Sequence, residues 1–302
     1  LTGRLVELGK SPGARGLASL KKLVSRSGEP IIRTAMRQAM RIMGKQFVLG
    51  RTIKEALETA EPLAKDGWRF SFDMLGESAM TEPDAERYQT SYMKAVEAVG
   101  ASSKGADVFA APSVSVKLSA LHPRYEEKTK ARCLPTLYAR ILDLAVAAKK
   151  RNIGLTIDAE EAARLDISLE LFGQLAAAPE LQGWNGLGLA VQAYGRRAKP
   201  ALEWLAALAQ KTGRILPVRL VKGAYWDSEV KWAQERGLSD YPVFTRKVNT
   251  DVSYLACARF LLSEPDAFYP QFATHNAHTI AAIHTLAGSR PYEFQRLHGM
   301  GE

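Results

Sequence analysis

The stretch LPVRLVKGAYWD at residues 216–227 is the part of the sequence that most strongly indicates the fold. Its apolar first half predicts a strand buried on both faces, as in a parallel sheet covered by helices. Arg219 and Lys222 lie near the end of this strand, and a buried cation is costly unless an anion meets it. Gly223 permits close backbone approach, and Tyr225 and Trp226 add flat aromatic surfaces. The two cations could form structural ion pairs, but the complete cluster favours a site for a planar, phosphate-bearing cofactor.

Further apolar runs on both sides of this stretch predict more strands. Seven runs have the expected length and composition: 68–75, 113–121, 154–159, 186–194, 215–222, 272–275 and 292–297. Stretches with helical periodicity lie between them, including 137–150, 169–177, 200–212 and 249–262. Repeated strand–helix units of this kind predict a parallel sheet, either doubly wound or closed into a barrel.

The polar residues at the predicted strand ends favour the barrel. They follow almost every strand and comprise Asp73, Glu77, Lys117, Asp158, Gln192, Arg219, Lys222, His275 and Asn276. A barrel gathers all strand ends around one site, whereas an open sheet has one switch point. The sequence also has no Gly-rich dinucleotide fingerprint after a strand. We therefore expect an α/β fold, a (β/α)8 barrel whose last βα unit lies beyond Glu302, with residues 51–302 in the barrel and 1–50 as a helical lead-in.

The bulk composition is that of a globular protein, with 46% hydrophobic and 24% charged residues. There is no apolar run of transmembrane length and no signal-peptide pattern, and the two cysteines match no metal or redox spacing. A reducing cytosol is the default for such a chain. Much of the net charge of +9 lies in the first fifty residues, where 30–43 predicts an amphipathic helix. A solvated helix face is favoured there over nucleic-acid or membrane binding.

Lys117 is the first candidate for chemistry, because it ends a buried strand. Its ammonium must find a carboxylate or lose its charge, and Asp158 at the end of the next strand is the natural partner. Lys117 could be structural, could anchor a substrate or could form a Schiff base. Glu160 and Glu161 are expected in the first turn of the following helix, where the helix dipole favours acids.

Neutral and basic side chains complete the candidate set. Gln192 can both donate and accept hydrogen bonds without changing charge, which suits a flavin or carbonyl edge. The run from Thr274 to Asn276 is interpreted as phosphate or ring contacts, since His275 lacks further metal ligands nearby. The basic turn 244–247 predicts a phosphate grip near a helix start, or otherwise a solvated turn.

Several longer motifs in the same order resemble a known family. They are SVKLSALHPRY (115–125), TIDAEEA (156–162), RLVKGAYWD (219–227), FATHNAHT (272–279) and YEFQRLHGMGE (292–302). These motifs resemble the proline dehydrogenase part of the bifunctional proline utilization A flavoenzymes, and the resemblance extends over essentially the whole chain. It implies a distorted (β/α)8 barrel that binds FAD non-covalently and oxidises L-proline to Δ1-pyrroline-5-carboxylate.

The resemblance also implies partners and a location. Electrons would pass to a membrane quinone, and a pyrroline-5-carboxylate dehydrogenase domain would be fused beyond this segment. Nucleic acid would be a partner only if a separate N-terminal DNA-binding domain exists. We therefore expect a cytoplasmic protein that can also lie peripherally at the inner membrane. The family's paired arginines for the proline carboxylate belong to the last βα unit, which is expected beyond Glu302.

Carried over residue by residue, the resemblance implies three sets of site residues. The catalytic set is Lys117, Asp158, Arg219 and Tyr225, with Arg219 beside the flavin N5 edge. The substrate set is Glu77, Lys117, Tyr225 and Leu297. The cofactor set is Asp158, Ala159, Gln192, Arg219, Val221, Lys222, Gly223, Ala224, Trp226, Phe244, Thr245, Lys247, Ala273, Thr274, His275 and Asn276. No metal is expected.

Two other functional classes stay open on the sequence alone. The first is a Schiff-base aldolase barrel with Lys117 as the nucleophile. The second is a non-enzymatic scaffold whose basic N-terminal helix, with Arg33, Arg37 and Arg41, binds nucleic acid or a membrane surface.

Overall fold

The structure is a computed structural model, which describes residues 48–103, 105 and 107–301, together with residues 33, 34, 36, 37, 40, 44, 46 and 47. The predicted helix 30–43 lies for the most part outside the described residues. The chain divides into two compact units, Leu1–Leu49 and Gly50–Glu302. The second unit carries the sheet and the candidate site.

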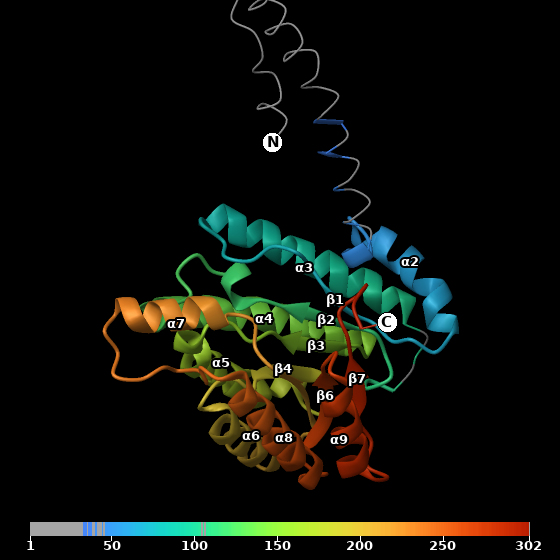
Figure 1. The fold of residues 1–302 in the computed structure, drawn as a ribbon. Coiled ribbons are helices and arrows are strands. Elements are labelled where there is room, and N and C mark those ends of the chain that lie inside the picture. Colours follow the sequence, from blue (N-terminus) through green and yellow to red (C-terminus); the bar gives the residue numbers. More distant parts are fainter. Residues whose placement is uncertain are drawn as a thin grey trace, which may run out of the picture. The chain divides into compact units, whose positions relative to one another are not determined.

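Seven parallel strands form one sheet in chain order from β1 to β7 (Figure 1). The strands are β1 (Ser71–Asp73), β2 (Ser113–Val116), β3 (Gly154–Ile157), β4 (Leu187–Gln192), β5 (Leu216–Val221), β6 (Phe268–Ala273) and β7 (Glu293–Gln295). Helices precede β1 and connect each strand to the next: α2 (Ile53–Lys65), α3 (Glu82–Ser102), α4 (Lys130–Arg151), α5 (Leu165–Ala176), α6 (Ala198–Thr212), α7 (Trp226–Glu235), α8 (Lys247–Ser263) and α9 (Ala277–Ala287). The predicted alternation of strands and helices is confirmed.

The sheet is curled, and one side chain demonstrates this. Arg219 on β5 donates hydrogen bonds to Ser71 on β1, to Ser115 on β2 and to Gln295 on β7. A single guanidinium reaches strands this far apart in sheet order only if the sheet bends around it. The predicted fold class, a distorted TIM-like barrel, is confirmed by this curl and by the parallel strand order.

Local sequence signals explain where helices begin and end and why one strand is buried. Thr81 and Asp84 form a capping box at the start of α3, and Asn152, in the left-handed conformation, caps the end of α4. All four residues of β3 are buried, as expected for a strand covered on both sides. No helix in the described ranges is both long enough and apolar enough to cross a membrane.

All seven predicted strands differ in length from the observed ones, and three of them show why. The run 113–121 was predicted as one strand, but β2 ends at Val116 and Leu118–Ala120 form a 3-10 helix. The run 68–75 is reduced to the three residues of β1. Strand β6 begins at Phe268, four residues before the predicted start at 272. The prediction began too late because Pro270 lies inside the strand, and proline interrupts the sequence pattern expected of a strand. Apolar composition alone does not distinguish a buried strand from a buried turn.

Candidate active site

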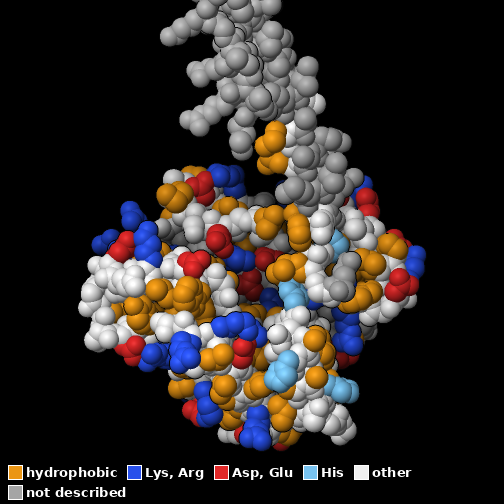
Figure 2. Space-filling view, viewed as in Figure 1, with side chains coloured by type: hydrophobic (Ala, Val, Ile, Leu, Met, Phe, Trp, Pro, Cys, Tyr) orange, Lys and Arg blue, Asp and Glu red, His pale blue; other side chains and the backbone are white. Residues whose placement is uncertain are grey.

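Four charged side chains meet inside the curl, at the carboxyl ends of β1, β2, β3 and β5. Lys117 Nζ lies 3.0 Å from Asp158 Oδ2 and 3.1 Å from Asp73 Oδ2, and Arg219 Nη1 lies 2.9 Å from Asp158 Oδ1. The side chains of Lys117, Asp158 and Arg219 are 17%, 14% and 12% exposed. Two cations and two carboxylates therefore balance one another in a mostly buried cluster. Figure 2 shows a hollow near the centre of the visible face, with acidic and basic side chains in it.

The predicted pairing of Lys117 with Asp158 is present, but Asp73 is a second partner. Burial by itself lowers the pKa of Lys117, whereas Asp158 and Asp73 raise it, and together they outweigh burial. The pKa of the ammonium is therefore raised above its ordinary value, and Lys117 stays protonated near neutral pH. A lysine nucleophile must lose this proton before it can attack a carbonyl.

A second cluster joins the turn after β5 to the start of α8. Lys222 and Lys247 both bind Asp251, the latter over 2.7 Å. Hydrogen bonds from Lys222 and Lys247 hold the pKa of Asp251 below its usual range. Trp226, the first residue of α7, donates its indole N–H to the carbonyl of Phe244 over 3.0 Å. The predicted phosphate and ring contacts Lys222, Trp226, Phe244 and Lys247 are thus brought together, with Thr245 exposed beside them.

The turn itself has a backbone that only glycine adopts easily. Gly223 has φ +140°, and a Cβ at this position would come within 2.4 Å of the ring of Tyr194. The Tyr194 hydroxyl accepts a hydrogen bond from the backbone N–H of Tyr225 over 3.3 Å. Gln192 also supports the turn, because its Oε1 accepts from the N–H of Ala224 over 3.0 Å. The other side of the Gln192 amide donates to the carbonyl of Glu160 over 2.8 Å.

The remaining predicted residues lie at strand ends or on the loops that follow the strands. Glu77 is exposed in the loop after β1, and Leu297 is 66% exposed after β7. His275 accepts from the N–H of Leu297 over 3.2 Å, and Asn276 caps α9 through the N–H of Thr279. Ala159, Val221, Ala273 and Thr274 lie at strand ends or directly after them.

Sequence reasoning missed several residues of the site. Asp73 was noted only as a polar strand end, although it binds Lys117. Ser71 and Ser115 bind Arg219, and their place on the strands allows them to face the same interior. Asp251 lies four residues after Lys247, the spacing of a helical ion pair, and this signal could have identified it.

The expected place of Glu160 in the first turn of a helix is wrong. The short 3-10 helix begins at Ala162 and α5 begins at Leu165, so Glu160 lies in the preceding loop. Its side chain is 4% exposed and bonded to Arg164 and to the N–H of Ser119. A buried hydrogen-bonded contact, and not the helix dipole, determines its position.

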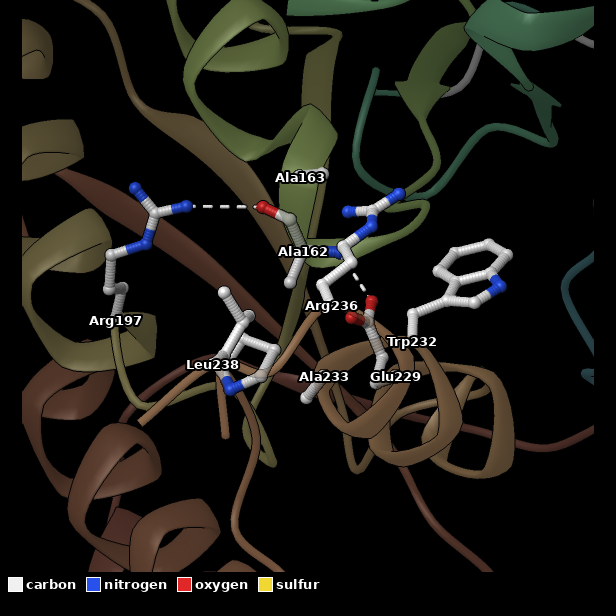
Figure 3. A pocket seen from close by; sticks show the side chains of 9 residues that line it. Ala162, Ala163, Arg197, Glu229, Trp232, Ala233, Arg236 and Leu238 are labelled. Atoms are coloured by element: carbon white, nitrogen blue, oxygen red, sulfur yellow. Dashed lines mark hydrogen bonds between the residues drawn. The ribbon is translucent and has the colours of Figure 1, made fainter. Parts of the chain in front are cut away.

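A separate small cavity lies outside the strand ends, between α7 and the loop after β3 (Figure 3). It has a volume of about 210 Å³, and the buried carboxylate of Glu229 on its wall accepts from the N–H of Ala162. No residue predicted for the site lines it. Within the part of the chain that the structure describes, there is no group of three or more His, Cys, Asp or Glu residues that could hold a metal.

Residues 56–302 match the family model described as proline dehydrogenase. The chain belongs to the proline dehydrogenase family. The resemblance inferred from the motifs is confirmed, and with it the membership of a family of oxidoreductases that act on proline.

Similar proteins place the chain within this family. It is 53% identical to the bifunctional protein PutA of Salmonella typhimurium, over 100% of this chain and 23% of that protein. A crystal structure of a D778Y mutant of proline utilization A from Bradyrhizobium japonicum is 53% identical, with a TM-score of 0.82 over 93% of this chain and 29% of that chain. The proline utilization A structure from Bdellovibrio bacteriovorus is 30% identical, with a TM-score of 0.85 over 90% and 30%. The chain therefore spans less than a third of the length of these relatives.

The first part of the chain matches a second model. Residues 1–47 match the DNA-binding domain of proline dehydrogenase. This match favours the nucleic-acid alternative for the basic segment over the solvated helix face that the sequence suggested. Most of that segment lies outside the described residues.

Proposed function

We propose that this chain forms the catalytic barrel of an FAD-dependent enzyme that oxidises L-proline to Δ1-pyrroline-5-carboxylate. The observation that carries the proposal is the match of residues 56–302 to the proline dehydrogenase family. The charge-balanced cluster around Arg219, at the carboxyl ends of the strands, supports it, because active sites of such barrels lie at this end.

The residues present suit a flavin dinucleotide. Lys222 and Lys247 offer cations beside the turn after β5, where a pyrophosphate could replace part of their pairing with Asp251. Trp226 is 42% exposed while its indole N–H is held by Phe244, so a flat aromatic face is available for adenine. Gly223 permits close approach of the backbone at the same place. We propose that the other residues of the predicted cofactor set, the first of which after Asp158 is Ala159 and the last Asn276, contact the same flavin dinucleotide.

A bound flavin would supply the acceptor for the hydride that leaves the ring carbon next to the proline nitrogen. In this scheme Arg219 stabilises negative charge that develops near it, since its guanidinium is already held in place by four hydrogen bonds. Lys117 with Asp158 orients the substrate and excludes water, and Tyr225, Glu77 and Leu297 form the outer part of the substrate pocket. Lys117 remains protonated in this role.

We extend the proposal to the expected partners. Electrons would pass to a membrane quinone, which requires a cytoplasmic protein that can reach the inner membrane surface. The product would be consumed by a fused pyrroline-5-carboxylate dehydrogenase domain.

The absorption spectrum of the purified protein tests the enzymatic proposal. We expect a yellow protein whose flavin absorbance bleaches when proline is added under anaerobic conditions, because the electrons then remain on the flavin. A sample that stays colourless in saturating FAD would refute the assignment. Lys117→Met should retain FAD while losing turnover, because it removes the cation but keeps the length of the side chain.

The aldolase alternative receives no support from the site. A Schiff base needs a neutral amine, whereas Asp158 and Asp73 keep Lys117 charged. Trapping of a substrate on Lys117 by borohydride would reverse this conclusion.

We also propose that the N-terminal segment binds DNA, on the basis of its match to a DNA-binding domain. The test is the salt dependence of polynucleotide binding by the intact protein, compared with a variant in which Arg33, Arg37 and Arg41 are neutralised. Each phosphate contact that is lost should reduce the slope of log K against log salt by about 0.9. An unchanged slope and affinity would contradict the proposal.

A further inference from the structure

Glu160 is a buried carboxylate at the carboxyl end of the barrel for which the proposed reaction has no direct use. Its Oε1 accepts from the backbone N–H of Ser119 over 2.9 Å, and its Oε2 pairs with Arg164. The Arg164 guanidinium lies 5.1 Å from the centre of the Tyr125 ring, which restricts the arginine further. Burial raises the pKa of the Glu160 carboxyl, while Ser119 and Arg164 act against this rise. A carboxylate kept buried in this way is a fixed anchor.

Ser119 connects Glu160 to the loop that carries Glu77. Its hydroxyl accepts from the N–H of Ser78 over 3.1 Å, and its carbonyl accepts from the N–H of Ala79 over 2.8 Å. Ser78 has φ +59°, a left-handed conformation that is unfavourable for serine unless other contacts hold it. Two of the contacts that hold this loop therefore depend on the position of Ser119.

The backbone of Glu160 holds a second loop. Its carbonyl accepts from the Gln192 amide over 2.8 Å, and Gln192 in turn accepts from the N–H of Ala224. Burial raises the pKa of the phenol of the next residue, Tyr225, and the carboxylates of Glu77, Glu160 and Glu161 add to this rise. Glu229 on α7, the helix that follows this turn, accepts a hydrogen bond from the N–H of Ala162, which comes directly after the loop that contains Glu160 (Figure 3).

We propose that Glu160 is a positioning residue that holds the Glu77 loop and the Tyr225 turn in register with each other, and so determines the affinity of the site for its amino-acid substrate. The proposal rests on the proposed function, which places Glu77 and Tyr225 in the substrate pocket. Without the Glu160 carboxylate, the Glu77 loop would have to be ordered against the Tyr225 turn when the substrate binds, and this cost weakens binding. Lys117, Asp158 and Arg219 lie on or directly after the strands and would stay in place.

The test compares three substitutions in the intact, flavin-loaded protein. Glu160→Ala should raise KM for proline roughly tenfold or more while kcat stays within about twofold, because binding and not chemistry is impaired. Glu160→Gln should have a smaller effect, since Gln keeps an acceptor for Ser119 but loses the charge facing Arg164. Glu161→Gln is the matched control, because Glu161 pairs with the same Arg164 over 3.2 Å, and it should leave KM unchanged. Loss of kcat with an unchanged KM in Glu160→Ala would overturn the proposal.

Amide hydrogen exchange gives a readout that is independent of turnover. The amides of Ser78 and Ala79 should exchange faster in Glu160→Ala and Glu160→Gln, but not in Glu161→Gln. Adding Ser78→Gly to Glu160→Ala should recover part of KM, because glycine adopts the left-handed conformation without strain.

The two proposals can fail separately. A parent protein that does not oxidise proline refutes the proposed function, and exchange at Ser78 and Ala79 then decides the positioning role alone. If Glu160→Ala does not fold, Glu160→Gln decides it. Unchanged exchange at both amides in the folded variants overturns the proposal.

Discussion

At the scale of single residues, Arg219 and Asp158 determine how charge is placed inside the barrel. Arg219 donates to Ser71, Ser115, Asp158 and Gln295, so its planar guanidinium is fixed in one orientation. Asp158 binds Arg219 through one oxygen and Lys117 through the other. Its removal would leave two mostly buried cations with too little negative charge.

Asp158→Asn should therefore lower the free energy of unfolding by about 3 kcal/mol, the range expected when a buried ion pair loses one partner. Asp166→Asn is the matched control, because Asp166 forms an exposed pair with Arg197 and such pairs contribute about 0–1 kcal/mol. Urea unfolding measures both. Equal losses in the two variants would show that the cluster is not desolvated as described.

At the scale of elements, β5 and the turn that follows it connect the two clusters of the site. The strand places Arg219 inside the curl, and seven residues later the chain enters α7 at Trp226, beside Phe244. This short passage depends on Gly223, where the backbone is left-handed and Tyr194 lies against it.

Gly223→Ala should destabilise the protein by about 3 kcal/mol, since the added methyl group is strained and also meets the Tyr194 ring. Gly213→Ala is the control: its φ is +63°, but nothing lies within 4 Å of the new Cβ, so only about 1 kcal/mol is expected. Thermal unfolding and flavin content should be measured on both variants. A Gly223→Ala protein as stable as Gly213→Ala would contradict the close approach of Tyr194.

At the scale of the whole molecule, helices cover a curled sheet and bury tyrosines at their contacts with it. Tyr92 on α3 is fully buried, and its hydroxyl accepts from the N–H of Lys117 over 3.2 Å. Burial raises the pKa of Tyr92 from 10.0 to about 12. Burial also raises the pKa of Tyr125, Tyr194, Tyr225 and Tyr254. The fold thus favours the neutral phenols.

The raised pKa of Tyr92 predicts a loss of stability in alkali. Because the folded pKa exceeds the unfolded one, this contribution is fully present below pH 10 and is lost as the pH rises towards 12. Tyr92→Phe removes the hydrogen bond from Lys117, so the free energy of unfolding at neutral pH should fall by about 1 kcal/mol. Above pH 10, however, the stability of the variant should fall less steeply than that of the parent. Urea unfolding at several pH values, with Tyr138→Phe as control, measures this. Parallel pH curves for Tyr92→Phe and the parent would refute it.

The gathering of polar side chains at the ends of the strands could be predicted, because parallel strands bring their carboxyl ends to one place. This rule identified Lys117, Asp158 and Arg219 correctly as neighbours, and the match to the family followed from the longer motifs. The prediction failed for Glu160, whose contact with Ser119 joins residues forty-one apart in the chain. Local rules such as the helix dipole carry no information about such a contact.

By itself, the sequence determined the alternation of strands and helices and the cluster of cations and aromatics after β5, because both follow from short-range pattern and from the cost of burying charge. Only the tertiary structure decided that Asp73 shares Lys117 with Asp158, that Ser71 and Gln295 face Arg219, and that Glu160 anchors two loops. These contacts depend on how far the sheet curls. The degree of curl results from the packing of all seven strands and their helices together, and no single segment encodes it.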